Sequence, residues 1–396
     1  MAVNAVCSTN SVWITNIDAN MAAVVRAGFC ERVFCFRSQV GLCSPICNAA
    51  YSGNVRRKSY AIQYTEFGDP NKVLQKVEVE REKVGPEDVG VKVLAAPINP
   101  ADINIIQGTY GVKPKLPAIA GLEGVAQVTE VGSNVKNLSA GNWVLMPGDK
   151  MGTWRQHGVA NHKKFRKISD KLGLVTAATL TVNPPTAYRM LSDFVKLEPG
   201  DTFIQNGANS GVGQAAIQIG KCMGLKSINV VRNRPNLEEL KKSLQALGAD
   251  HVVTEEDLRT DVMKNVLSAV PPPRLGLNCV GGKATSDMMR HLANDATIVT
   301  YGGMSRQPLT VSVAALIFKN LKAVGFWRTH WAKLHSMTKV DDEMYDFLTR
   351  IALDGKLRPP AHNTVPLDNF QEAVRKSMEA FTGAKQILVM DESGSV

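Results

Sequence analysis

The chain has 396 residues, of which 44% are hydrophobic and 21% charged, so it is long enough to form two globular domains. Its formal net charge of +10 suits anionic small molecules or an acidic partner, but no long basic run or aromatic-interleaved patch indicates nucleic-acid binding. No apolar stretch predicts a membrane span.

Residues 1–59 differ in composition from the rest of the chain. This segment contains arginine and serine but only two acidic residues, Asp18 and Glu31, and it ends in the basic run 56–59. These features predict a leader that resembles a mitochondrial transit peptide. An ordinary disordered tail and a downstream start at Met21 remain alternatives. The segment also holds five of the seven cysteines, namely Cys7, Cys30, Cys35, Cys43 and Cys47.

Residues 60–182 are predicted to form a β-rich domain. Apolar and other residues alternate at 89–94, the run 121–131 predicts a strand pair, and 142–145 predicts a further strand. Short strands separated by turns are typical of a compact, mostly antiparallel domain.

Residues 183–330 are predicted to form a second domain that binds a dinucleotide. A strand at 202–205 leads into a turn with three glycines, and a helix begins at Val212 and ends before Gly224. A second strand at 227–231 completes a βαβ unit, whose helix N-terminus offers free N–H groups to an anion. The glycines Gly207, Gly211 and Gly213 do not follow the strict G-x-G-x-x-G spacing, so a turn that only packs the helix on the sheet remains an alternative.

The end of that second strand indicates which dinucleotide is bound. In units that bind NAD an acidic residue about 20 positions on holds the ribose hydroxyls, whereas a 2′-phosphate needs a cation. Here the strand ends in Arg232, Asn233 and Arg234, without a carboxylate. This pattern favours NADPH, although arginines at a strand end are also common as solvated surface residues.

The α/β alternation continues to the end of this domain. Leucines at helical spacing follow Arg234, and strands are predicted at 251–253, 275–280, 296–301 and 322–326, several of them ending in glycine. This order predicts a doubly wound parallel sheet. A helix from Asp341 and a closing strand at 385–390 are expected to return residues 331–396 to the first domain.

The body of the chain, residues 60–390, contains the motifs INPADINIIQGTYG, GLEGVAQV, NSGVGQAAIQI, LNCVGG, TYGGM and GFW. Through these motifs it resembles the medium-chain dehydrogenase/reductase superfamily and, within that superfamily, the zinc-free trans-2-enoyl-thioester reductases. This resemblance implies a Rossmann cofactor domain, a GroES-like catalytic domain, and NADPH-dependent reduction of enoyl thioesters carried on acyl carrier protein or CoA. It also implies mitochondrial fatty-acid synthesis in the matrix and a homodimer joined through the cofactor domains.

No metal is expected, although the superfamily includes zinc alcohol dehydrogenases. Catalytic zinc keeps three protein ligands, and the slot that holds a histidine in those enzymes is Leu122 here, before Glu123. His157 and His162 read as an ordinary surface pair. The two cysteines of the body, Cys222 and Cys279, lie too far apart in the sequence to indicate a metal cluster.

Without a metal, the thioester oxygen needs a hydrogen-bond donor. When hydride adds to Cβ of a conjugated thioester, negative charge gathers on the carbonyl oxygen, and a phenol that stays protonated at working pH can donate to it. Tyr110 is the candidate, although a tyrosine that only anchors its glycine-flanked loop fits the same residues. The resemblance implies the catalytic role, because these reductases carry their catalytic tyrosine in the same Q-G-x-Y-G context.

The resemblance also implies the cofactor contacts. A quinone reductase of the same fold and a non-catalytic NADPH-binding protein remain alternatives, since a fold by itself does not confer an activity. Aromatic residues after the last strand, Phe326, Trp327 and Trp331, fit an acyl pocket but also a core or an interface. The implied NADPH contacts are Asn183, Asn209, Ser210, Gly211, Val212, Arg232, Asn233, Arg234, Tyr301, Gly302, Gly303, Met304, Phe326, Trp327, Arg328, Thr329 and Lys385.

Overall fold

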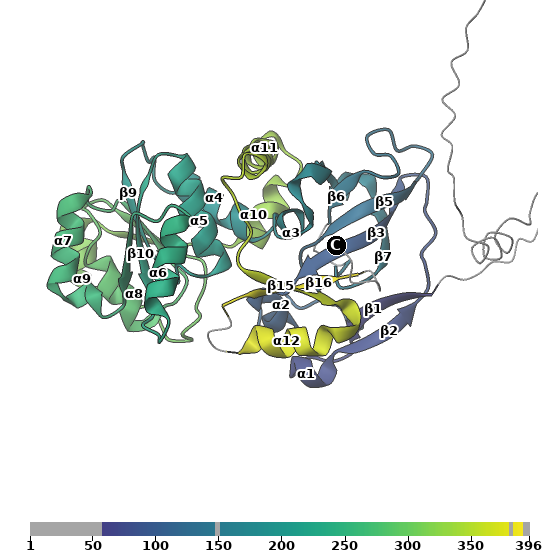
Figure 1. The fold of residues 1–396 in the computed structure, drawn as a ribbon, viewed down its shortest axis with the longest axis horizontal. Coiled ribbons are helices and arrows are strands. Elements are labelled where there is room, and N and C mark those ends of the chain that lie inside the picture. The colour runs from purple at the N-terminus through teal and green to yellow at the C-terminus, as the bar shows by residue number, and fades with distance from the viewer. Residues whose placement is uncertain (1–57, 147–150, 380–382, 391–396) are drawn as a thin grey trace, which may run out of the picture. The chain divides into compact units, whose positions relative to one another are not determined.

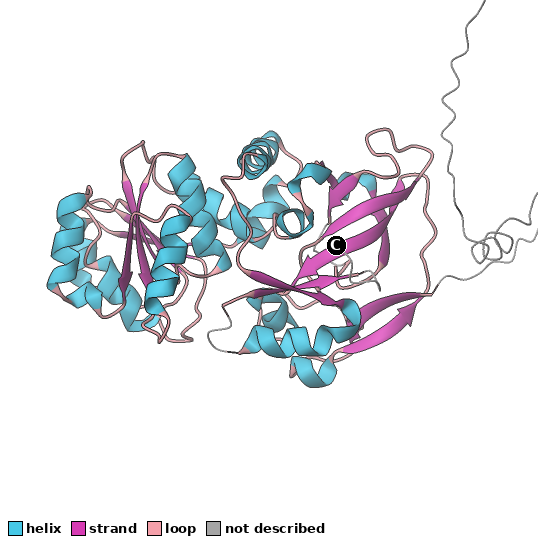
Figure 2. Cartoon of the chain, viewed as in Figure 1, coloured by secondary structure: helices cyan, strands magenta, loops and turns pink. Residues whose placement is uncertain are grey.

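The computed structural model describes residues 58–146, 151–379 and 383–390, all of which belong to one compact unit, Arg56–Val396. The expected leader, residues 1–59, lies outside the described residues apart from Lys58 and Ser59. Three sheets and the helices around them make up the described structure (Figures 1 and 2). One sheet is wholly parallel, and the two others are mainly antiparallel.

The β-rich part contains two of the sheets. The smaller has the strand order β2-β1-β4, and the larger has the order β15-β16-β3-β5-β6-β8, with β7 also paired to β3. Pairing is antiparallel except between β15 and β16. The elements are β1 (Ser59–Tyr64), α1 (Pro70–Val73), β2 (Gln75–Val79), β3 (Asp88–Pro97), α2 (Pro100–Ile106), β4 (Ala118–Ile119), β5 (Val125–Val131), β6 (Trp143–Leu145), β7 (His157–Asn161), β8 (Arg166–Ile168), α3 (Leu174–Ala178), β15 (His362–Pro366) and β16 (Lys385–Val389).

The predicted strand pair at 121–131 is wrong, because this segment contains only the strand β5. Gly121 has a φ of 99°, and a Cβ atom there would lie 2.4 Å from Cδ1 of the Trp154 ring. A left-handed backbone this close to an indole suits glycine alone. The chain therefore turns at Gly121, and the turn buries the side chain of Glu123 before β5 begins.

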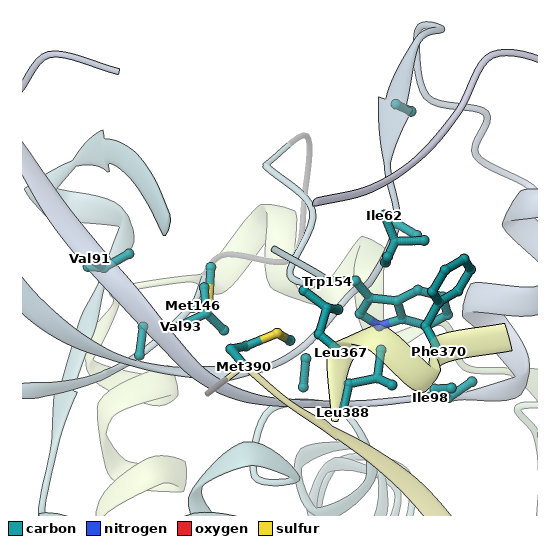
Figure 3. Close-up of a cluster of buried hydrophobic side chains, with 14 of the residues drawn as sticks. Ile62, Val91, Val93, Ile98, Met146, Trp154, Leu367, Phe370, Leu388 and Met390 are labelled. Carbon is teal, nitrogen blue, oxygen red and sulfur yellow. The ribbon is translucent and has the colours of Figure 1, made fainter. Parts of the chain in front are cut away.

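Apolar side chains from distant segments form the core of the β-rich part (Figure 3). Trp154 is completely buried, beside Ile62 of β1 and Ile98, which follows β3. Phe370 and Leu388 reach the same cluster from the end of the chain. Burial of this surface is the main stabilising contribution to the domain, and it requires the C-terminal segment to pack against the first strands.

The parallel sheet has the strand order β11-β10-β9-β12-β13-β14, so the chain reverses direction across the sheet between β9 and β12. Buried side chains alternate along each strand: Phe203 packs towards α4 and α5, whereas Ile204 packs towards α7 and α8. Helices therefore cover both faces, which confirms the doubly wound α/β fold. The elements are α4 (Asn183–Asp193), β9 (Thr202–Asn206), α5 (Gly211–Cys222), β10 (Lys226–Val231), α6 (Leu237–Ala246), β11 (His251–Thr254), α7 (Asp261–Ala269), β12 (Leu275–Asn278), α8 (Gly282–Met289), β13 (Thr297–Thr300), α9 (Val313–Lys319) and β14 (Lys322–Gly325).

Strand β12 is shorter than the predicted 275–280. The N–H groups of Cys279 and Gly281, which would continue the ladder, instead donate to the side-chain oxygens of Asn206 and Asn278, at 2.7 and 3.0 Å. Side chains that bond to nearby backbone N–H groups compete with the sheet. The strand consequently ends at Asn278 and the chain turns into α8.

The last segment joins the two parts. Helix α10 (Arg328–His335) and helix α11 (Lys339–Leu353) follow the parallel sheet, and α12 (Phe370–Met378) precedes β16. Strand β16 pairs antiparallel with β3, where Leu388 faces Ala96. The end of the chain thus completes the sheet from which α2 departs, and this places Lys385 beside the start of α2.

Candidate functional site

The turn between β9 and α5 has the geometry of an anion site. Gly207 has a φ of 59°, and the Ser210 hydroxyl accepts from the Gly213 N–H at 3.1 Å, which caps the helix. A Cβ atom on Gly213 would lie 2.5 Å from the Ala208 carbonyl oxygen, so the close approach of helix and turn requires glycine. The half-buried start of α5 then offers N–H groups to a phosphate.

A buried amide at the same place fits a pyrophosphate. Asn183, the first residue of α4, is 9% exposed, and its Nδ2 has no hydrogen-bond partner in the described structure. That nitrogen would lie 2.8 Å from a Cβ on Gly211, so it faces the first turn of α5. A buried donor without an acceptor is costly, and a phosphate oxygen would satisfy it. The residues present here therefore fit a bound dinucleotide.

The basic pair lies where β10 ends. Burial and the neighbouring Arg232 guanidinium lower the pKa of Arg234, so the two cations repel each other. Burial raises the pKa of the nearby Glu255 carboxyl, and Arg232 opposes that rise. A second cation beside the first costs free energy that a dianionic phosphate would recover. Asn233 is exposed between the two arginines.

Residues 301–304 follow β13 (Thr297–Thr300) and lie beside the end of β12, next to the point where the strand order reverses. The N–H of Tyr301 donates to the Asn278 carbonyl at 3.0 Å, and the N–H of Met304 donates to the Cys279 carbonyl at 3.0 Å. Burial raises the pKa of the Tyr301 phenol well above its usual value, and Ser210 of the glycine turn opposes that shift. Sheets of this kind bind ligands at the carboxyl ends of their parallel strands, beside such a reversal. Gly302 and Gly303 continue the same loop.

Tyr110 follows α2 and contacts the cofactor domain. Its N–H donates to the Asn104 carbonyl at 3.2 Å, which ties it to the last turn of the helix. The Nε1–H of Trp327 donates to the Tyr110 hydroxyl oxygen at 3.1 Å, and the two rings meet edge to face. An oxygen that accepts from the indole keeps its own proton available for another acceptor. Tyr110 can therefore donate to a ligand held between the two parts.

Other aromatic and basic residues after β14 pack around this contact. Phe326 stacks edge to face on Phe194 at 5.8 Å, and the Arg328 guanidinium lies 5.2 Å from the Trp331 ring centre. Arg328 also donates to the Tyr345 hydroxyl at 3.4 Å. Phe326 thus has a protein partner, as its core alternative requires. Arg328 also has protein partners, whereas Trp327 is 40% exposed beside Tyr110. Thr329 and Val212 are partly buried, and the Asn209 carbonyl accepts from Gln214 at 2.8 Å.

Lys385 belongs to a buried polar group that the sequence did not reveal. Its ammonium group donates to the side-chain oxygen of Asn99, whose amide nitrogen donates to Glu123 at 2.8 Å. Asp102 accepts from the Asn99 N–H at 2.7 Å. Burial lowers the pKa of Lys385, and the two carboxyl groups oppose that shift. The available signal was the Asn-Pro-Ala-Asp run, which is a helix-capping sequence.

Neither His157 nor His162 lies in a cluster of possible metal ligands. His157 lies beside Arg81 and Ser59, and His162 lies beside Asn137 and Glu87. Within residues 58–146, 151–379 and 383–390, no three His, Cys, Asp or Glu side chains gather closely enough to hold a metal ion. In the same ranges, no helix has the length and apolar character needed to cross a bilayer.

Two family models match the chain. The alcohol dehydrogenase GroES-like domain matches residues 85–186, and the zinc-binding dehydrogenase family matches residues 211–343. The mitochondrial enoyl-acyl-carrier-protein reductases of Rattus norvegicus and Homo sapiens are each 51% identical over 330 residues, which cover 83% of this chain and 88% of the relative. The Arabidopsis thaliana protein of the same name is 44% identical over 335 residues, covering 84% of this chain and 88% of the relative.

The solved structures that share this fold come from proteins named for different ligands and activities. The Etr1p complex with NADP and crotonyl-CoA is 36% identical with a TM-score of 0.79, and the match covers 84% of this chain and all of that one. A quinone oxidoreductase from Pseudomonas syringae is 25% identical with a TM-score of 0.71, over 84% of this chain and all of that one.

Proposed function

Because the chain belongs to the family of mitochondrial enoyl-acyl-carrier-protein reductases, we propose that it reduces the Cα–Cβ double bond of trans-2-enoyl thioesters. NADPH, when bound, supplies the hydride that adds to Cβ. A proton added at Cα completes the saturated acyl thioester. The protein is thus an NADPH-dependent oxidoreductase that acts on a carbon–carbon double bond.

The contact between Tyr110 and Trp327 supports this function best. Hydride addition leaves negative charge on the thioester oxygen, and a donor aimed at that oxygen lowers the barrier. Tyr110 keeps its proton available because its oxygen accepts from Trp327. Assistance by such an acid is typically worth about 10²–10⁴ in rate. We therefore assign Tyr110 as the donor to the thioester oxygen.

The cofactor site is assembled around α5. We propose that the start of α5, Ser210 and the buried Asn183 amide hold the pyrophosphate, and that Arg232 and Arg234 hold the 2′-phosphate. The loop 301–304 lies beside the point where the strand order reverses, and we place the nicotinamide end of NADPH there. The remaining proposed contacts are Asn209, Gly211, Val212, Asn233, Phe326, Trp327, Arg328, Thr329 and Lys385.

Quinone reduction is the alternative, because a quinone oxidoreductase shares the fold. An electron-poor quinone needs no dedicated donor at its oxygen, so the Tyr110 contact favours the enoyl thioester. The test is NADPH oxidation with crotonyl thioester beside a panel of quinones. We expect rapid turnover with the thioester alone. Turnover with quinones and none with the thioester would reverse the assignment.

We propose that the substrate arrives on acyl carrier protein or on CoA. Both carriers are anionic, and the basic net charge of the chain suits either. We also propose that the enzyme works in the mitochondrial matrix, in fatty-acid synthesis, with residues 1–59 as the transit peptide. The domain limits at residues 60, 183 and 331 and the absence of a catalytic metal remain our predictions.

A homodimer through the cofactor domain is proposed from an exposed edge of the parallel sheet. All four residues of β14 are exposed, and β14 is the last strand of that sheet. Helix α9, directly before it, exposes Leu316, Ile317 and Phe318, the last of them 79% exposed. An open edge beside apolar side chains favours pairing with a second copy.

A further inference from the structure

Five polar residues from four segments, three of them buried and two partly buried, form a group that is here called the Glu123 cluster. Its members are Asn99, Asp102, Glu123, Thr181 and Lys385. Glu123 is completely buried, and Asp102 and Asn99 are 2% and 3% exposed. Charged groups removed from water this far are costly unless they are paired and hydrogen-bonded. The cluster is therefore an arrangement that the fold maintains at a cost, beside the proposed site.

Both carboxylate oxygens of Glu123 have partners. One accepts from the Asn99 amide at 2.8 Å. The other accepts from the Thr181 hydroxyl at 3.1 Å and from the Val182 N–H at 2.9 Å. These donors come from two directions, the start of α2 and the segment that enters α4. One side chain thus holds an end of each helix.

The same bonds lead to three residues of the proposed site. The Asn99 amide bridges the Glu123 carboxylate and the Lys385 ammonium group, so its orientation depends on both charges. Val182 directly precedes Asn183, whose buried amide faces the first turn of α5. Helix α2 begins after Asn99 and ends four residues before Tyr110.

We propose that Glu123 is a positioning residue of the reductase site, one that holds Lys385, Asn183 and helix α2, which leads to Tyr110, in the arrangement that binds NADPH productively. This inference rests on the proposed function and deepens it. Glu123 acts through these neighbours, because its oxygens are occupied by Asn99, Thr181 and Val182. Groups that react across a cofactor must be held to within a fraction of an ångström, and supporting hydrogen bonds provide that precision.

The first test replaces Glu123 by glutamine, which keeps the shape and removes the charge. The amide NH₂ of the glutamine would replace one of the two carboxylate oxygens. It would therefore face either the Asn99 amide or the Thr181 and Val182 donors, and a donor cannot accept their hydrogen bonds. We expect the NADPH dissociation constant, measured by fluorescence titration, to rise about tenfold and kcat with crotonyl thioester to fall about tenfold, because misplaced groups cost rate steeply. The control is Glu130→Gln, an exposed position in the strand that follows, with values within about twofold of wild type.

A double-mutant cycle separates positioning from simple support of the fold. If Glu123 acts through Lys385, then Glu123→Gln combined with Lys385→Met should weaken NADPH binding no more than the worse single variant does. Additive losses would contradict the proposal. A Glu123→Gln protein with a lowered melting temperature but wild-type NADPH affinity and kcat would overturn it, because the residue would then only stabilise the fold.

A milder variant decides the matter if Glu123→Gln does not fold. Thr181→Val removes one donor to the carboxylate and keeps the volume nearly constant. We expect about a twofold to fivefold loss in NADPH affinity from one hydrogen bond, and unchanged affinity would refute the positioning role. NADPH affinity is measured without substrate, so it stays informative even if wild type failed to reduce crotonyl thioester, a failure that would contradict the proposed function alone.

Discussion

The indole of Trp327, which follows the last strand of the parallel sheet, donates a hydrogen bond to the hydroxyl oxygen of Tyr110, which follows α2 of the β-rich part, at 3.1 Å. This hydrogen bond joins residues that are 217 positions apart in the chain. The contact joins the proposed acid, Tyr110, to the parallel-sheet domain. The roles of Tyr110 and Trp327 can be tested separately by replacing each in turn.

Replacing Tyr110 by phenylalanine should remove the donor and keep the ring. We expect kcat and kcat/KM for crotonyl thioester to fall together by roughly 10²-fold or more, the pattern of an interaction made mainly in the transition state. Fluorescence titration should give an unchanged NADPH affinity. Rates within about threefold of wild type would remove Tyr110 as the acid and favour the quinone reductase.

Replacing Trp327 by phenylalanine should keep an aromatic ring but remove the N–H that donates to Tyr110. A hydrogen bond to the phenolic oxygen stabilises the charge that grows there as the proton leaves, so its loss should lower kcat by about twofold to tenfold. The combined Tyr110→Phe, Trp327→Phe enzyme should be no slower than Tyr110→Phe alone. Independent, multiplying losses would show that Trp327 acts elsewhere.

Replacing Arg232 and Arg234 together by alanine should weaken NADPH binding by at least about tenfold and leave NADH binding nearly unchanged. The charge-assisted bonds to the 2′-phosphate are lost, whereas the start of α5 still holds the pyrophosphate. Dissociation constants for both nucleotides, measured side by side, check this. Equal losses for the two would mean that the arginines do not bind the 2′-phosphate.

The Asp102 carboxyl should make stability depend on pH in a defined direction. Its pKa is raised to about 7, mainly by burial and also by the Glu123 carboxyl, whereas the Asn99 N–H and Lys385 oppose the shift. The folded chain therefore keeps this proton at pH values where the unfolded chain has lost it. The stability this provides is present below the ordinary carboxyl pKa and is lost as pH rises through 7. Tyr64, Glu123 and Lys385 also face this group.

Replacing Asp102 by asparagine imitates the protonated acid and should remove that loss. The advantage of the variant over wild type should grow by roughly 2–3 kcal/mol between about pH 5 and about pH 8, which melting temperatures measured at both values would show. Asp346→Asn, an exposed position on α11, should show no such growth. A constant difference across this range would mean that Asp102 is ionised throughout.

Placing charges on α9 should disrupt the proposed homodimer. Ile317→Glu with Phe318→Glu would put two carboxylates into the apolar surface beside β14, where burial without partners costs several kcal/mol. Light scattering after gel filtration should then give the mass of a monomer. Val262→Glu changes another exposed apolar residue, which lies on α7, and should leave the dimer intact. A variant of α9 that stays dimeric would place the interface elsewhere.

The sequence by itself determined the elements of the cofactor domain and their order. Helical spacing of leucines after Arg234, apolar strand runs and the glycine turn are local signals, because each depends on residues within a few positions of one another. The same holds for the basic pair at the end of β10 and for the Q-G-x-Y-G context of Tyr110. The two errors at 121–131 and 275–280 arose where tertiary contacts, an indole against Gly121 and the side chains of Asn206 and Asn278, ended a run that looked like a strand.

Only the tertiary structure decided what surrounds these residues. Nothing local to Glu123 indicates that its carboxylate is buried among Asn99, Thr181 and Val182, or that Lys385 reaches Asn99 across most of the chain. The partner of Tyr110 was equally hidden, because Trp327 comes from the other domain. Pairings between distant residues depend on how whole sheets and helices pack, since that packing alone brings such side chains within hydrogen-bond distance. The sequence therefore predicts which residues could react, whereas the contacts around them come from the fold.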